Sequence, residues 1–291
     1  MNAFTEAGRG LASGNDDVRV LRRVQLEEGP TGDVSVGPTK PAAVLSVATS
    51  GSQDEGGQRV AVSVRRFHYD SDGMVTRLET PQFWSAGTKY VDEVASGTAS
   101  EPAPVLDGQI SEEELLGVLL TSSIIISHRA SFDRPWIESL LPEAGGLAWA
   151  CSATEVDWWS RGFEGPSLGY LLCQTGWFYD AESRAGEVDG LIQLLRHRFD
   201  DGRSVLSLLV ERALRTSWIF RAHGASFAVK EQLRDRGYRW DAERRVWWKE
   251  ISDAEKLQEE LWLAINVYRA GKGARAMGPY CEQMTAEKRF I

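Results

Sequence analysis

The sequence predicts an α/β protein with a mixed sheet flanked by helices, followed by a small α+β domain at the C-terminal end. A short apolar run with β-branched residues at 42–47 is typical of a buried strand, and helical and strand patterns then alternate from 111 to 151. The charge also changes along the chain. Residues 212–249 contain ten Lys or Arg and four Asp or Glu, so this segment carries +6 and the rest of the chain −15 of the total of −9. These patterns indicate two domains with different surfaces.

The composition sets the broad class. With 291 residues, 42% apolar and 26% charged, the chain can form one large core and a smaller domain. It contains no run of about 18 apolar residues and no secretory signal pattern, so we expect a cytoplasmic protein with no membrane partner. The three cysteines lack Cys-x-x-Cys spacing, which predicts neither a disulfide framework nor a zinc site. The negative total charge argues against polyanion binding by the whole surface.

The first elements form a sheet that begins at its centre. Residues 1–40 are rich in Gly, Thr and Pro and predict an N-terminal arm. The buried strand at 42–47 comes next. Residues 58–69 alternate apolar and polar side chains, 70–73 form a turn, and 74–78 can pair back as a hairpin.

Helices and strands then alternate. Ser111 and Glu114 have the spacing of a capping box in front of a helix at 115–120. A strand at 124–126 follows, and the same order of helix and strand repeats within 132–151. This succession predicts helices that cover a mixed sheet.

The chain is expected to divide into four parts: an arm at 1–40, a first domain at 41–200, a connecting helix at 201–217 and an accessory domain at 218–291. In the accessory domain, strand patterns at 218–220 and 246–248 alternate with helical patterns at 227–236 and 254–268. This part is therefore predicted to be a small α+β domain.

Three segments carry the motifs that bear on function: Ser46-Val47-Ala48-Thr49-Ser50-Gly51, His128-Arg129-Ala130-Ser131-Phe132-Asp133 and Ser183-Arg184-Ala185-Gly186-Glu187-Val188-Asp189. They resemble the motifs of the DnaQ-like (DEDDh) 3′-5′ exonucleases, which read Asp-x-Glu-Thr-Thr-Gly, His-Asn-Ala-x-Phe-Asp and His-Arg-Ala-x-x-Asp. The resemblance implies a ribonuclease H-like fold, four acids that hold two divalent ions, and a histidine general base. The C-terminal part resembles the small domain that follows the exonuclease domain in a bacterial branch of this family.

The resemblance is degenerate at the positions that carry the chemistry. Ser46 and Ala48 stand where the family has its first Asp and Glu, and Ser183 stands where it has the general base. Asp133 is retained, and Asp189 arrives one position late. Two carboxylates without a base predict no catalysis and at most a single weakly bound Mg²⁺ or Mn²⁺. The leading hypothesis is therefore a catalytically inactive protein.

Other interpretations of the acids remain open. An active enzyme with altered ligands could recruit Glu182 or Glu187 beside the two retained acids. Asp54 and Glu55 are a weaker pair of replacement ligands, because they lie in a Gly-rich turn beyond the strand. Asp133 could also serve only as an acid that stabilises a helix N-terminus.

Basic and aromatic residues in the accessory domain suggest binding to nucleic acid, DNA or RNA, as single strands or 3′ ends. The candidate contacts are His128 in the first domain and, in the accessory domain, Arg239, Trp240, Arg245, Trp247 and Lys249. The alternatives are that the tryptophans form the core of a small domain and that His128 is a polar residue at the end of a strand. Two further hypotheses are that the protein binds a protein partner, and that it is a protein-interaction scaffold without affinity for nucleic acid.

Overall fold

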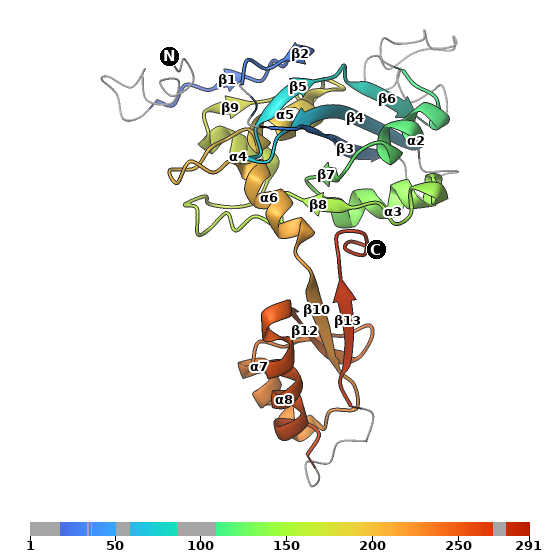
Figure 1. Ribbon diagram of the computed structural model, residues 1–291, viewed down its shortest axis with the longest axis vertical. Coiled ribbons are helices and arrows are strands. Elements are labelled where there is room, and N and C mark those ends of the chain that lie inside the picture. Colours follow the sequence, from blue (N-terminus) through green and yellow to red (C-terminus); the bar gives the residue numbers. More distant parts are fainter. Residues whose placement is uncertain (1–17, 34, 36, 51–58, 86–108, 270–277) are drawn as a thin grey trace. The chain divides into compact units, whose positions relative to one another are not determined.

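The computed structural model describes residues 18–33, 35, 37–50, 59–85, 109–269 and 278–291 (Figure 1). The chain forms two compact units. The first comprises Met1–Ala213 with Phe290–Ile291, and the second comprises Leu214–Arg289.

The first unit is built on a seven-stranded mixed sheet (Figure 1). Its central strand, β3 (Lys40–Ser50), pairs antiparallel with β4 (Arg59–Tyr69) and parallel with β7 (Ile125–Ser127). The order is β2-β5-β4-β3-β7-β8, and β6 pairs with β4. The outer strands are β5 (Val75–Leu78), β6 (Gln82–Ser85) and β8 (Trp149–Cys151). Because β3 is buried on both faces, its sequence is a continuous apolar run instead of an alternating one.

Helices cover both faces of this sheet. One face packs against α4 (Leu168–Gln174), α5 (Gly186–Leu195) and α6 (Val205–Leu214). The other packs against α2 (Glu112–Leu120), α3 (Ala130–Leu140) and the 3-10 helix η2 (Pro142–Ala144). Neighbouring residues of β3 enter different cores, since Val44 packs with the first set and Leu45 with the second.

The described part of the predicted N-terminal arm docks on the first unit. Its strand β1 (Arg22–Arg23) pairs with β9 (Trp177–Phe178), and β2 (Gly29–Pro30) pairs with β5. The fully buried Arg65 of β4 donates to the carbonyl oxygens of Leu26 at 3.2 Å and Glu79 at 2.8 Å. A buried arginine therefore links the arm to the sheet.

The second unit is a four-stranded antiparallel sheet with helices on one face (Figure 1). Its order is β11 (Arg239–Asp241), β12 (Val246–Ser252), β10 (Ser217–Ala222) and β13 (Tyr280–Met284). Helices α7 (Lys230–Asp235) and α8 (Lys256–Asn266) follow the 3-10 helices η3 (Phe227–Val229) and η4 (Asp253–Glu255). The core joins Phe220 and Ile251 of the sheet to Leu233 and Leu263 of the helices.

The structure confirms the predicted α/β class, with a mixed multi-strand sheet flanked by helices. The predicted hairpin is formed by β4 and β5, and the capping box is present, with Ser111 Oγ accepting from the Glu114 amide at 3.2 Å. The sequence patterns do not predict helix α4 or the strands β1, β2, β6, β9, β11 and β13, because these elements are short and lack a clear periodic pattern. None of the described helices has the length and apolar character needed to cross a bilayer.

Candidate functional site

The candidate site lies beside the C-terminal part of the central strand β3. Ser46 and Ala48 are two residues apart and therefore face the same side of the sheet. Ser46 is buried, whereas Ala48 is exposed. Because β3 and β7 are parallel, helix α3, which follows β7, begins close to this end of β3.

Asp133, in the first turn of α3, has protein donors on both carboxylate oxygens. Oδ1 accepts from the backbone N–H of Val47 at 3.1 Å, and Oδ2 accepts from the Ser127 hydroxyl. Burial raises the pKa of Asp133 from its ordinary value of 3.8 to about 6, against the opposing effect of these hydrogen bonds. Hydrogen bonds from two separate segments therefore hold Asp133 in the fold.

Helix α5 brings Glu187 to the site. The Ser46 hydroxyl donates to Glu187 Oε2 at 2.7 Å, which joins the first and third motifs directly. The charge of Glu187 also contributes to raising the pKa of Asp133, so the two carboxylates share one electrostatic environment.

Asp189 points elsewhere. It lies two residues after Glu187, which turns its side chain by about 200° around the helix axis. Its Oδ1 accepts from Arg65 Nη1 at 2.6 Å, in an ion pair whose arginine side chain is 1% exposed. The structure therefore does not place Asp133 and Asp189 together as metal ligands: Asp189 is the half-buried partner of the buried Arg65, and Glu187 is the acid beside Ser46.

Gly186 sets the start of α5. A Cβ atom at this position would lie 1.9 Å from the backbone carbonyl oxygen of Asp180, so only glycine allows this approach. Ser183, at the predicted general-base position, is exposed in the preceding turn, and Glu182 is exposed next to it. Gly186 is therefore part of the packing at the start of the helix that carries Glu187 to Ser46.

His128 is buried, which removes it from the predicted set of surface contacts to nucleic acid. It lies directly after β7, and its Nδ1 is 2.8 Å from the Ser152 hydroxyl. Burial lowers the pKa of the imidazole, although the nearby charge of Glu187 opposes this.

These residues do not fit a centre for two divalent ions. Such a centre needs several anionic oxygens free to bind metal, whereas both Asp133 oxygens accept from protein donors and Glu187 accepts from Ser46. Within the described ranges no cluster of three His, Cys, Asp or Glu side chains has the arrangement of a metal site. Asp54 and Glu55 lie outside the described residues.

The accessory-domain candidates separate onto two faces of the second sheet. Trp240 and Trp247 are cross-strand partners with their rings 5.6 Å apart, and Trp247 packs against the core below the helices. Lys249 lies on the same face, where its Nζ is 3.5 Å from the buried Glu259. Arg239 is exposed on the opposite face, and Arg245 is exposed in the turn between β11 and β12.

Ion pairs within the second unit neutralise much of the basic segment. At least six of its ten basic side chains pair with acids: Arg221, Lys230, Arg234, Arg236, Arg244 and Lys249. Arg239 and Arg245 form no ion pair with any described residue. The sequence charge of this segment therefore overstates the cation available to a ligand.

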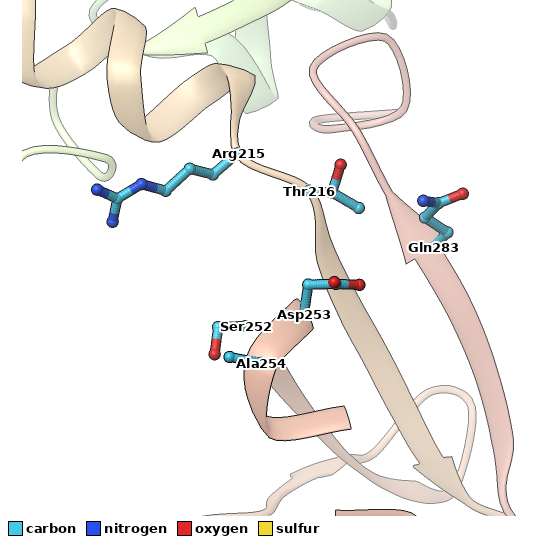
Figure 2. Close-up of a pocket in the computed structure, with 6 residues that line it drawn as sticks. All are labelled: Arg215, Thr216, Ser252, Asp253, Ala254 and Gln283. Carbon is cyan, nitrogen blue, oxygen red and sulfur yellow. The ribbon is translucent and has the colours of Figure 1, made fainter. Parts of the chain in front are cut away.

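A surface hollow of about 440 Å³ lies in the second unit beside η4 (Figure 2). It is lined by Arg215, Thr216, Ser252, Asp253, Ala254 and Gln283. The Asp253 carboxylate already accepts from Trp218 Nε1 at 2.7 Å, and the Ser252 hydroxyl is held by Glu255 in a capping box. These internal bonds mark the hollow as part of the capped start of α8.

Sequence reasoning missed Arg65 as the partner of Asp189 and Ser127 as a donor to Asp133. One signal was available for Arg65: it alternates with Phe67 and Tyr69, so it belongs to a buried face of β4. No comparable pattern marked Ser127.

Comparison of the chain with protein-family models, with curated proteins and with solved structures found no match.

Proposed function

We propose that the chain is a non-hydrolytic relative of the DnaQ-like 3′-5′ exonucleases, with a ribonuclease H-like first unit, that binds single-stranded nucleic acid or its 3′ ends. The observation that carries this proposal is the meeting of three separate segments. The Val47 amide donates to Asp133, which lies 86 residues further along the chain. The Ser46 hydroxyl donates to Glu187, which lies 141 residues further along the chain. These are the three segments whose sequences resemble the exonuclease motifs, and their contact supports a common origin of the site.

The hydrogen bonds of the site support the absence of hydrolysis. In two-metal phosphodiester cleavage, one ion activates water and the other stabilises the leaving oxygen, so the ligands must be anionic and free to bind metal. Here the Ser46 hydroxyl donates a hydrogen bond to Glu187, and the Val47 backbone amide donates one to Asp133. The methyl side chain of Ala48 has no atom that can bind metal. In this chain the Glu187 and Asp133 carboxylates instead stabilise the fold through these hydrogen bonds.

A nuclease assay tests this proposal directly. We expect purified full-length protein with Mg²⁺ or Mn²⁺ to leave 5′-labelled single-stranded DNA and RNA intact while retarding both in a binding assay. Metal-dependent shortening that is lost in Asp133→Ala would overturn the non-hydrolytic assignment. Absence of any retardation would overturn the assignment of nucleic-acid binding.

Restoring the acids provides a test of the site itself. Ser46→Asp with Ala48→Glu places two carboxylates beside Glu187, where like charges repel unless a cation binds between them. We expect this double variant to gain Mn²⁺ binding by calorimetry. The uncharged control, Ser46→Asn with Ala48→Gln, is expected to bind no better than wild type; equal binding by both variants would contradict the proposed location of the site.

A second candidate function is an active metal-dependent exonuclease with altered ligands. The observation that favours it is that Glu187 and Asp133 accept hydrogen bonds from adjacent residues of β3, Ser46 and Val47. Asp189 is held by Arg65, so Glu187 is the acid available as a second ligand. This candidate predicts two tight Mn²⁺ sites in wild type and the loss of both metal binding and nuclease activity in Glu187→Gln. A calorimetric titration of wild type therefore distinguishes the two functions.

A further inference from the structure

One row of side chains crosses all four strands of the second sheet. Arg239 on β11 pairs with Trp248 on β12, Trp248 pairs with Arg221 on β10, and Arg221 pairs with Tyr280 on β13. Directly paired residues of antiparallel strands have their side chains on the same face. The order along the row is therefore cation, aromatic ring, cation, aromatic ring, and this set of four residues is termed the Arg–Trp row.

The Arg–Trp row lies on the face of the sheet that the described helices do not cover. Phe220 and Ala222, which flank Arg221 along β10, pack into the core with α7 and α8. Alternate residues of a strand face opposite sides, so Arg221 and its cross-strand partners face away from these helices. Figure 1 shows α7 and α8 together on one side of this sheet.

The row presents accessible groups. Tyr280 is 52% exposed and Arg239 is exposed, while Trp248 is half-buried between its two arginine neighbours. The Arg221 guanidinium lies 5.8 Å from the centre of the Tyr280 ring, and its Nη1 donates to Glu282 at 2.9 Å. Arg221 is therefore held in position, whereas Arg239 forms no ion pair with any described residue.

We infer that the Arg–Trp row is a binding surface for single-stranded nucleic acid. This inference rests on the proposed function and names the surface and the kind of ligand. Aromatic rings stack on unpaired bases, and arginines contact phosphates or stack on bases themselves. Trp248 and Tyr280 are two strands apart, about 10 Å, so each ring can take a separate base of one strand. A four-stranded sheet that stacks bases on aromatic side chains is a general mode of single-strand recognition.

The charges around the row favour a polyanion on the side of β11. Arg245, at the end of the β11–β12 hairpin, adds a second cation without an ion pair to any described residue. On the same face, Asp241 of β11 is paired with Arg244, and the next row contains Glu250 and Glu282. The phosphate path is therefore expected along the β11–β12 hairpin, away from Glu250 and Glu282.

Fluorescence anisotropy of full-length protein with a labelled thymidine oligonucleotide of about 20 nucleotides tests the row. Stacking on one ring contributes about 1–3 kcal/mol, so Trp248→Ala is expected to weaken binding by roughly 5- to 150-fold. Trp248→Phe is expected to recover most of the affinity. Arg239→Ala is expected to weaken binding and to reduce its salt dependence, because it removes one phosphate contact.

Phe227→Ala is the matched control, because Phe227 is also an exposed aromatic residue of this unit but lies on η3, outside the sheet. Trp240→Ala tests the candidate contact on the opposite face of the same hairpin. Tyr280→Ala, on the edge strand, gives a second variant of the row at an exposed position. If wild type binds and the row variants bind equally well, or if Trp240→Ala alone loses affinity, the row is wrong and nucleic-acid binding stands. If wild type binds no oligonucleotide, both the row and the proposed nucleic-acid binding fail, and a protein partner becomes the remaining ligand.

Discussion

Substitution of Asp133 by asparagine is expected to remove a pH-dependent loss of stability. Each tenfold change in a protonation equilibrium corresponds to about 1.4 kcal/mol, so raising the pKa of Asp133 from 3.8 to about 6 corresponds to about 3 kcal/mol. Because the folded-state pKa is raised, the protonated acid is the form that the fold favours. This contribution is complete below pH 3.8 and is lost as the pH rises through about 6. An asparagine keeps an acceptor for the Val47 amide and carries no charge.

Urea unfolding of wild type and Asp133→Asn measures this effect. The measurements should be made at several pH values between about 4 and 7.5, the window that the linkage between pKa and stability gives. The free energy of unfolding of wild type, relative to that of the variant, is expected to fall by about 2–3 kcal/mol across this window. Other groups titrate in the same range, but they cancel in the difference between the two proteins. A difference that stays constant with pH would refute the claim that burial, rather than the hydrogen bonds from Ser127 and Val47, dominates the environment of Asp133.

Two further stability predictions follow from the packing of α5. Arg65→Met leaves the Asp189 carboxylate without its buried partner, so the free energy of unfolding in urea is expected to fall by about 3–5 kcal/mol. The control is Arg77→Met, at an exposed position of β5, which is expected to change this free energy by less than about 0.5 kcal/mol. A small effect of Arg65→Met would contradict a structural role for Asp189. Gly186→Ala is expected to cost about 1–3 kcal/mol, because its Cβ meets backbone at 1.9 Å, whereas Gly117→Ala in α2 meets nothing within 4 Å and is expected to stabilise by up to about 1 kcal/mol. Equal stability of the two alanine variants would show that the start of α5 can relax.

Local patterns predicted the central strands of the first unit and several of its helices, but not the short strands β1, β2, β6 and β9 or helix α4. The apolar run of β3, the alternation of β4 and the Ser111–Glu114 capping box each act over a few residues, so their signals are complete within a short window. The short strands β11 and β13 carry no such signal, because they form only by pairing with neighbours that are distant in the sequence.

The site shows the same division. Sequence spacing identified the segments that meet. It placed Asp189 in the site, although this residue lies one position after the expected acid, and it left Glu187 as an alternative. The rotation of a helix decides between the two, and that rotation depends on the close approach of Gly186 to Asp180. A contact between two backbone segments leaves no periodic pattern in the sequence.

Sequence alone determined the α/β class, the order of the central strands and their neighbouring helices, and the absence of acidic side chains at positions 46 and 48, because these depend on residue type and short-range periodicity. Only the tertiary structure decided which charges remain available. It places Lys249 against Glu259, Arg221 against Glu282 and Asp189 against Arg65, and it leaves Arg239 exposed beside Trp248. A charged side chain attracts a ligand strongly only when no ion pair within the fold neutralises it. The partners in such ion pairs are often far apart in the sequence, so chain folding decides which charges are paired.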